Sequence, residues 1–383
     1  MHSTYFDYLL TLIANTNECL DMGLNQIRIS AYSLGELSEL HQSNWWQESP
    51  FIPLSTLRLH SYLNNPRAEE NDVVLYLALE KNSLVGFRTL LPDHFETGKG
   101  KLSMAWLSGS WTHPDYRRQG ISSELFLKTT EYWQGRLAFS NYAPHSRKLY
   151  DQMDYEWSKM ELIGTRYYHR FALSSILPGR SHLFRNSTSL LKAIDKLFNS
   201  VVDAFNRRSD APQLKFELIQ QLSLEDDEFI GQFLDHQIFA RSVREFNWIQ
   251  SFPWVTEDTH FEKEQAKYPF SLIARQFQSF FCKFLNDKHE LQALAMVHIH
   301  NGFLCMPYVF VPESQAKNLE AFIKSFVKQN KISVTTLSSS KTEKDIHLGP
   351  VSKSYDRNFF FGPELSVPEN ATINYGDGDA VFV

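Results

Sequence analysis

The sequence is poor in cysteine: its 383 residues include only Cys19, Cys282 and Cys305. Three widely separated thiols are too few for a disulfide framework or for a four-ligand zinc site. So few cysteines suit a reducing compartment, and we expect a cytoplasmic location.

Long apolar runs and an excess of positive charge are also lacking. No window approaches the roughly 18 uninterrupted apolar residues of a membrane span, which leaves only peripheral membrane association open. The formal net charge of −6 disfavours nucleic acid as a partner, because phosphate recognition needs a continuous basic surface. The N-terminal stretch YFDYLLTLIANTNECLDMGL has no basic segment or cleavage pattern of a signal peptide, so we expect a helix there.

Apolar residues are nevertheless plentiful, at 43% of the chain, which is enough for conventional cores. At roughly 150 residues per domain, the length predicts two domains. We expect a first domain over residues 1–177, a linker over residues 178–212 that contains an amphipathic helix, and a second domain over residues 213–383. Because that helix carries four charged residues, we expect it to pack between the domains.

Hydrophobic patterning predicts strands and helices in the same order in both halves. In the first half we expect strands at residues 26–32, 73–80, 84–91 and 102–111, a helix from residue 121, a strand at 135–141, a short helix at 146–153 and a strand at 155–168. In the second half we expect a strand at 215–222, a hairpin within 279–311, a helix at 313–330 and a strand at 332–339. This order is typical of a mixed α/β fold with a mostly antiparallel sheet flanked by helices, present twice.

The segment THPDYRRQGIS, which begins at Thr112, joins an apolar strand to the helix that follows it. The first N–H groups of a helix have no internal partner and attract anions. Gly120 and the small Ser122 would let a pyrophosphate approach these N–H groups, and Arg117 and Arg118 would add charge-assisted contacts. The alternative is an ordinary loop with solvated arginines and a turn glycine.

This segment resembles the acyl-CoA-binding motif of the GNAT (Gcn5-related N-acetyltransferase) superfamily, Q/R-x-x-G-x-G/A. Arg117, Gly120 and Ser122 occupy the three signature positions. About 33 residues downstream, SRKLYDQMDYEW is similar to the family's second motif, although Asp154 stands where the family prefers glycine and Ala143 where it often has asparagine. The resemblance covers residues 26–168.

The resemblance implies a protein that uses acetyl-CoA or another acyl-CoA as donor and transfers the acyl group to an amine acceptor. It implies that Tyr150 protonates the departing thiolate. The alternative is a tyrosine that is packed on the short helix and whose hydroxyl group forms a local hydrogen bond. The donor-binding residues would be Ser110, Trp111, Thr112, Arg117, Arg118, Gln119, Gly120, Ile121, Ser122 and Asn141.

The general base and the acceptor site are not identified by the sequence. Residues 107–110, where the family often carries glutamate, contain no carboxylate, and we expect the nearby His113 to face solvent. Trp45, Trp46 and Phe51 are candidates for an acceptor pocket or for ordinary packing, and Arg88 for a substrate clamp or a surface cation.

The second half lacks R-x-x-G at the corresponding place, and Glu313 at the helix start would repel a pyrophosphate. We therefore expect a degenerate GNAT-like copy without CoA. His298 and His300 share a strand face but have no evident third ligand, so we expect no metal. The competing hypotheses for the whole chain are a noncatalytic CoA-binding scaffold and transfer to an alcohol or aminoacyl group; the oligomeric state stays open.

Overall fold

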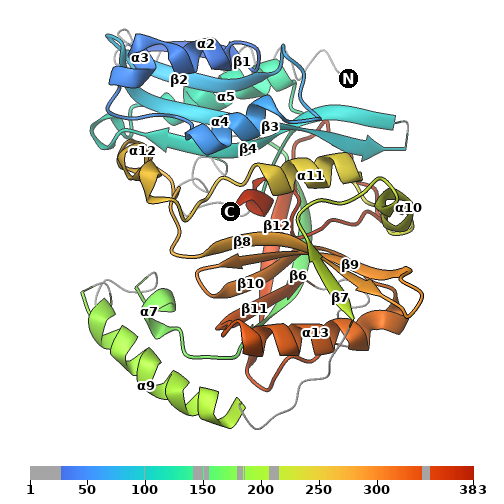
Figure 1. The fold of residues 1–383 in the computed structure, drawn as a ribbon. Coiled ribbons are helices and arrows are strands. Elements are labelled where there is room, and N and C mark those ends of the chain that lie inside the picture. The colour runs from blue at the N-terminus through green and yellow to red at the C-terminus, as the bar shows by residue number, and fades with distance from the viewer. Residues whose placement is uncertain are drawn as a thin grey trace. The chain divides into compact units, whose positions relative to one another are not determined.

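The computed structural model describes residues 27–98, 100–140, 150, 155–178, 184, 186–206, 215–338 and 346–383. It forms two compact units (Figure 1). Unit 1 contains the described residues up to Ser158, together with Glu262–Ser271 and Phe360–Val367. Unit 2 contains Lys159–Phe261, Leu272–Phe359 and Pro368–Val383. The predicted N-terminal helix lies outside the described residues, and of the helix predicted at 146–153 only Tyr150 is described, as helical.

Unit 1 is built on a sheet with the strand order β1-β2-β3-β4-β5, in which β5 is parallel to β4 and the other neighbours are antiparallel. Its strands are β1 (Ile27–Ser33), β2 (Val73–Glu80), β3 (Ser83–Thr97), β4 (Gly100–Thr112) and β5 (Leu137–Ser140). Lys81 and Asn82 both have positive φ, as a two-residue hairpin turn requires, and they join β2 to β3 with Glu80 opposite Ser83.

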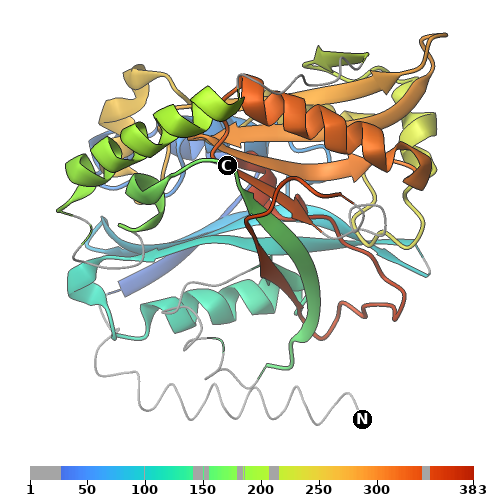
Figure 2. The ribbon, with the colours of Figure 1, turned by 90° about the horizontal axis from the view of Figure 1, so that it is seen from below.

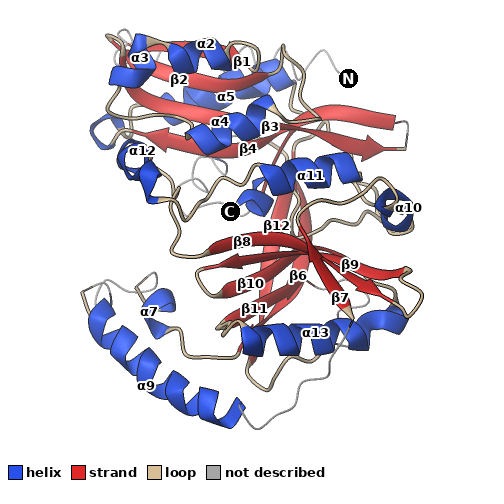
Figure 3. Cartoon of the chain, viewed as in Figure 1, coloured by secondary structure: helices blue, strands red, loops and turns tan. Residues whose placement is uncertain are grey.

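The helices of unit 1 cover both faces of this sheet (Figure 3). They are α2 (Leu37–Gln42), α3 (Asn44–Glu48), α4 (Thr56–Leu63), α5 (Ile121–Trp133) and α12 (Glu262–Lys267), with the 3-10 turn η1 (Pro114–Tyr116) before α5. Successive β3 residues point to opposite faces. Arg88 lies against Phe126 of α5, whereas the next residue, Thr89, bonds Arg58 of α4. Helices α5 and α4 therefore lie on opposite faces.

Unit 2 contains a sheet with the strand order β12-β6-β11-β10-β9-β8-β7. Its strands are β6 (Ser158–Tyr168), β7 (Phe216–Ile219), β8 (Phe277–Leu285), β9 (Leu291–His300), β10 (Phe303–Phe310), β11 (Val334–Ser338) and β12 (Ser352–Phe361), of which Ser158, Phe360 and Phe361 belong to unit 1. Its helices are α7 (Leu173–Ile176), α9 (Thr188–Asn206), α10 (Asp226–Gly231), α11 (Val243–Ser251) and α13 (Ala316–Gln329), with the turns η2 (Thr259–Phe261), η3 (Glu313–Gln315) and η5 (Asp379–Phe382).

Both units contain three antiparallel strands, a helix and a strand parallel to the last of the three. In unit 1 these are β2, β3, β4, α5 and β5, and in unit 2 they are β8, β9, β10, α13 and β11. The predicted fold class, a mixed and mostly antiparallel sheet flanked by helices, is confirmed. The relation of unit 2 to a degenerate GNAT domain stays a prediction.

The division of the chain differs from the predicted domain bounds. Unit 1 ends its main segment at Ser158 rather than at residue 177, because β6 pairs with β11, with Tyr168 opposite Val334. The predicted amphipathic helix is present as α9, but it belongs to unit 2 and not to a linker. The sequence did not predict α2, α3, α4, α7, α11, α12 or β12. Within the described part of the chain, no helix combines the length and the apolar character that a membrane crossing demands.

Candidate functional site

The turn between β4 and α5 is a sharp bend that leaves the start of α5 uncapped. Arg118 and Gly120 both have left-handed backbones, with φ values of 65° and 80°. Gly120 is the N-cap residue and offers no side-chain bond to the first N–H groups of the 13-residue helix. A left-handed residue followed by a helical one turns neighbouring N–H groups into one concavity, which suits an anion. Arg117, Arg118 and Gln119 are exposed around this bend.

A second glycine sets how closely α5 approaches the sheet. A Cβ atom on Gly86 of β3 would lie 2.9 Å from Cγ2 of Ile121 and 3.3 Å from the carbonyl oxygen of Trp111. Because Ile121 is the first residue of α5 and is buried, Gly86 lets the helix begin directly against the end of β4. The position of the bend therefore depends on a glycine 34 residues earlier in the chain.

Strand β4 bulges before it reaches this bend. Leu90 of β3 pairs with Leu107, but Thr89 pairs with Gly109, so Ser108 is an extra residue on β4. The pairing of β4 with β5 is confined to Ala105 and Trp106. Residues 109–112 of β4 have β3 on one edge, and no described strand pairs with their other edge. This edge could form main-chain hydrogen bonds with an extended ligand.

On the α5 face of the sheet, the guanidinium of Arg88 is fully buried, with 1% exposure. Its Nη1 donates to the hydroxyl oxygen of Tyr150 at 3.3 Å, and its Cζ lies 5.5 Å from the ring centroid of Phe126. Arg88 lies opposite Ser110 of β4. The expectation that Arg88 is a surface cation is therefore wrong, because the residue points inward from a central strand.

The ring of Tyr150 is part of an aromatic cluster. It stacks on Phe139 at 4.5 Å and meets Phe126 edge-on at 5.6 Å. Packing and the bond from Arg88 fix the position of the hydroxyl group. This arrangement is compatible with the predicted acid and equally with the alternative of a packed tyrosine.

On the opposite face, Arg58 of α4 binds the bulge. Its Nη2 lies 2.7 Å from Ser108 Oγ and 2.7 Å from Thr89 Oγ1, and Nη1 lies 3.3 Å from the hydroxyl of Tyr268. A Cβ on Gly109 would lie 2.6 Å from Thr89 Oγ1 and 3.2 Å from Arg58 Nη1. The bulge is thus held by an arginine that the sequence did not single out. The local sequence indicates only where the helix of Arg58 begins: Ser55 is its N-cap residue, and the Ser55 side chain accepts a hydrogen bond from the N–H of Arg58.

His113 has a structural role at the bend. Its Nδ1 accepts a hydrogen bond from the N–H of Asp115 at 3.3 Å, and its ring packs edge-on against Phe51, Trp111 and Tyr116. The ring is only a quarter exposed, so the expectation of a solvent-facing histidine is wrong. With Nδ1 engaged as an acceptor, this atom is not available as a base.

The other candidates of the acceptor region serve packing. Trp46 is buried, and Trp45 Nε1 donates to the carbonyl of Asn82 at 2.7 Å. Phe51 packs on Trp111 at 4.8 Å between ring centroids. Trp111, a predicted donor-binding residue, therefore directs its side chain to the face opposite α5.

The remaining predicted donor-binding residues lie along β4 and the bend. Ser110 is exposed, Thr112 and Ser122 are half-buried, and the buried side chain of Ile121 anchors the helix start. Asn141 and the residues of the second motif other than Tyr150 and Tyr155 to Trp157 lie outside the described residues. The structure thus brings together the residues of the first motif, and it brings Tyr150 to Arg88.

In unit 2, the turn before α13 offers no comparable cradle. Pro312 is followed by η3, and the exposed Glu313 stands in its first turn. Among the described residues, no three histidine, cysteine, aspartate or glutamate side chains lie close enough to hold a metal. Burial, with a contribution from His300, lowers the pKa of His298 to about 3, so His298 is neutral at physiological pH.

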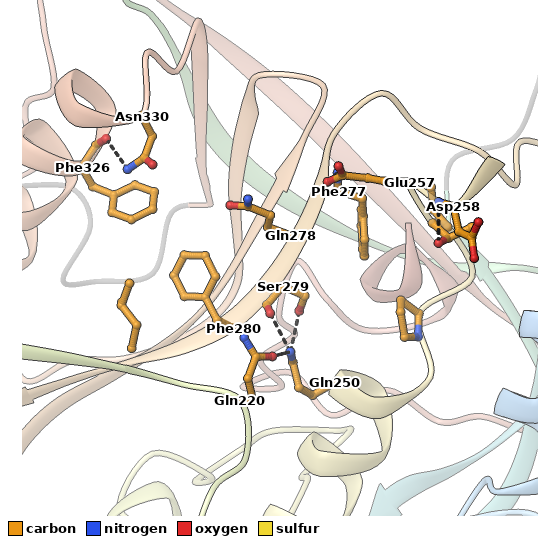
Figure 4. Close-up of a pocket in the computed structure, with 14 residues that line it drawn as sticks. Gln220, Gln250, Glu257, Asp258, Phe277, Gln278, Ser279, Phe280, Phe326 and Asn330 are labelled. Atoms are coloured by element: carbon orange, nitrogen blue, oxygen red, sulfur yellow. Dashed lines mark hydrogen bonds between the residues drawn. The ribbon is translucent and has the colours of Figure 1, made fainter.

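Unit 2 also contains a cavity of about 690 Å³ beside the β8 edge (Figure 4). Gln250 forms part of the cavity wall. Its Nε2 donates to Gln220 Oε1 at 2.7 Å and to the carbonyl oxygen of Ser279 at 2.6 Å, and its Oε1 accepts from Ser279 Oγ at 2.5 Å. On the rim, Glu257 accepts from the N–H of Phe277. Gln220, Gln250 and Ser279 thus bond one another along this wall.

Comparison with known proteins relates part of the chain to a protein family. Residues 46–158 match the family model described as an acetyltransferase (GNAT) domain. A search of curated proteins found no match.

Among solved structures, the chain is similar to the N-myristoyltransferase of Saccharomyces cerevisiae with bound myristoyl-CoA, at 10% identity over 91% of this chain and 89% of that chain, with a TM-score of 0.50. It also matches GCN5-related N-acetyltransferases from Anabaena variabilis (13% identity, 87% of this chain and 72% of that chain, TM-score 0.47) and Kribbella flavida (11%, 87% and 70%, TM-score 0.45). At 10% identity, the similarity to the N-myristoyltransferase concerns the fold alone.

Proposed function

We propose, from the GNAT domain that the chain carries over residues 46–158, that the protein transfers an acyl group from acyl-CoA to an amine. One observation carries the proposal: α5 begins at an exposed bend with the left-handed Gly120 as its N-cap and two arginines beside it. Uncapped N–H groups together with arginines are the donors that a pyrophosphate needs.

The donor would be held by residues 117–122 at its pyrophosphate and by the edge of β4 opposite β3, residues 110–112, at its pantetheine amides. This assignment is supported by the restriction of β4–β5 pairing to Ala105 and Trp106, so that residues 110–112 have no strand on that edge among the residues that the structure describes. An extended amide chain can hydrogen-bond to such an edge as an additional strand does. The thioester would then lie near the bulge at Ser108.

In the transfer step, the neutral amine of the acceptor attacks the thioester carbonyl carbon. A C–N bond forms and the C–S bond breaks; the sulfur takes the hydroxyl proton of Tyr150, and the new ammonium releases a proton to water, from which Tyr150 is reprotonated. Arg88 supports this role, because its positive charge lies 3.3 Å from the oxygen that becomes negative when the proton leaves.

Two measurements test the proposal. Thermal unfolding is recorded with and without acetyl-CoA and myristoyl-CoA, since a ligand at about 100 times its Kd stabilises by roughly 2.7 kcal/mol. Free thiol is then followed during incubation with a library of primary amines. Gly120→Glu, which places a carboxylate in the cradle, is expected to abolish both signals. Stabilisation without thiol release from any amine would favour the CoA-binding scaffold, and no stabilisation would refute donor binding.

A further inference from the structure

Helix α9 is held against the rest of unit 2 by its polar side. The carboxylate of Asp195 accepts hydrogen bonds from the N–H groups of Leu173 and Ser174 at the start of α7, at 2.8 and 2.9 Å. One turn later, the side chain of Asn199 bonds the backbone of Phe171 in both directions. Helix α7 accordingly lies beside α9 in two perpendicular views of the chain (Figures 1 and 2).

Lys192 lies on this same side of α9. At 3.6 residues per turn, it is about 20° from Asn199 and about 60° from Asp195 around the helix axis. Lys192 therefore faces α7, and it lines a cavity of about 500 Å³ together with Ser174 and Ser175 of that helix. The polar sides of two helices thus form one wall of the cavity.

The other wall of this cavity is formed by the turn between β9 and β10 and by the segment before β8. His300, Asn301 and Phe303 lie at the turn, and Arg275 precedes β8. Asn301 has a left-handed backbone, and its side-chain oxygen accepts from the N–H of Arg275 at 3.0 Å. Its own N–H donates to the carbonyl oxygen of Gln276 at 2.9 Å. The turn thus fixes the backbone from which Arg275 projects.

The charged side chains that line the cavity are cationic. Lys192 and Arg275 are exposed, and neither has an ion-pair partner among the described residues. His300 is half-buried, and burial lowers its pKa, so its neutral ring can donate an N–H. No carboxylate lines the cavity in the described part of the chain. An anion in this cavity would therefore meet cations and hydrogen-bond donors.

The size and the uncharged lining of the cavity indicate what such an anion carries. The hydroxyl-bearing Ser174, Ser175 and Thr188 and the amide of Asn301 line it, and Phe303 adds an apolar surface. Sites for small molecules occupy about 300–1,000 Å³. A water molecule takes only about 30 Å³ of liquid, so the cavity is much larger than a lone phosphate ion. Hydroxyl groups on the ligand can exchange hydrogen bonds with this lining, whereas an apolar ligand would leave it unpaired.

We propose that this cavity of unit 2 binds a small phosphate monoester whose organic part carries hydroxyl groups, as a sugar phosphate does. Arg275 and Lys192 bind the phosphate oxygens, the first through its planar fork and the second as a point charge. Ser174 and Ser175 bond the hydroxyl groups of the ligand. A nucleic acid fits less well, because the net charge of −6 repels a long polyanion. The site consists of residues of unit 2 and does not depend on the proposed acyl transfer.

Calorimetric titration of the full chain tests the proposal. The probes are glycerol 3-phosphate, ribose 5-phosphate and glucose 6-phosphate, compared with inorganic phosphate and with glycerol, ribose and glucose. We expect at least one of the phosphate monoesters to bind more tightly than inorganic phosphate, and the three unphosphorylated compounds not to bind. Lys192→Gln with Arg275→Gln should weaken binding about 100-fold, at about tenfold for each lost hydrogen bond to a charged oxygen.

Matched variants separate the site from general charge effects. Lys317→Gln with Arg244→Gln removes one lysine and one arginine that are exposed elsewhere on unit 2, and it should bind as the parent protein does. Ser174→Ala with Ser175→Ala should weaken binding of the monoester but not of inorganic phosphate. The proposal is overturned if no monoester binds more tightly than inorganic phosphate, which would indicate an adventitious ion only. It is also overturned if the monoester binds equally well to the parent and to either the variant without the two cations or the serine variant.

Discussion

Replacing Gly120 by alanine separates the backbone role of this residue from its proposed role at the donor site. Gly120 has φ 80°, a left-handed conformation that costs an L-residue about 1–2 kcal/mol. Gly120→Ala should therefore lower the free energy of unfolding by about that amount. It should also disturb the N–H groups at the start of α5. Losing one hydrogen bond to a charged oxygen costs about 1.5–3 kcal/mol, which weakens acyl-CoA binding roughly 10- to 150-fold.

A matched control is available in Gly302, at the turn between β9 and β10. Its φ is 83°, and a Cβ there would meet nothing closer than Ser333 Oγ at 3.8 Å. Gly302→Ala therefore imposes the same backbone strain at a place without a cradle. We expect the two variants to lose similar stability in thermal unfolding, while calorimetric titration with acetyl-CoA shows weaker binding only for Gly120→Ala. Equal Kd values for both variants would refute the assignment of the bend as the pyrophosphate site.

Four further predictions concern single side chains. Tyr150→Phe should keep acyl-CoA affinity but slow thiol release about 10²- to 10⁴-fold, as loss of a general acid does; an unchanged rate would remove Tyr150 from the mechanism. Arg88→Met should slow acyl transfer. It should leave the free energy of unfolding unchanged or raise it by up to about 4 kcal/mol, because a buried cation is costly. A loss of stability with normal turnover would contradict the role given to Arg88. Asp93→Ala should destabilise the chain by about 3–5 kcal/mol in urea unfolding, because it strands the buried Arg67, whose Nη1 lies 2.7 Å from Asp93 Oδ1. Burial lowers the pKa of His169 to about 4, so between pH 6.5 and 4 the unfolded chain binds a proton that the folded chain does not. The free energy of unfolding should therefore fall by at most about 3 kcal/mol as the pH is lowered through that window, and His169→Gln should remove this part of the pH dependence.

Local sequence signals predicted the elements that local forces determine. The strands at residues 73–80 and 102–111 correspond to β2 and β4, and the helix from Ile121 to α5, because period-two and helical patterns reflect burial on one or two faces. The bend was predictable as well, since a glycine followed by a helical pattern fixes where a helix starts. The repeat of the same order in the second half followed from the same patterns.

Contacts between distant segments could not be predicted in this way. The bulge at Ser108 depends on Arg58, 50 residues earlier, and on the packing of Tyr268, 210 residues after Arg58. Residues 262–271 return to unit 1 from the middle of the second half, and neither their composition nor their periodicity shows this. The burial of Arg88 likewise follows from the position of β3 in the centre of its sheet, which a single strand pattern does not reveal.

These long-range contacts give β4 the shape on which the proposed donor site depends. Two buried guanidinium groups lie on opposite faces of β3. Arg88 belongs to β3 and points to the α5 face, whereas Arg58 binds the next β3 residue, Thr89, on the other face. Burying an arginine costs free energy that packing alone does not return, so a purely structural sheet would favour apolar side chains at both places. Arg58 bonds the bulge residue Ser108, and Arg88 bonds Tyr150 at the end of the aromatic cluster. Together they concentrate positive charge where β4 leaves β5, which is the place where the proposed acyl transfer would develop negative charge.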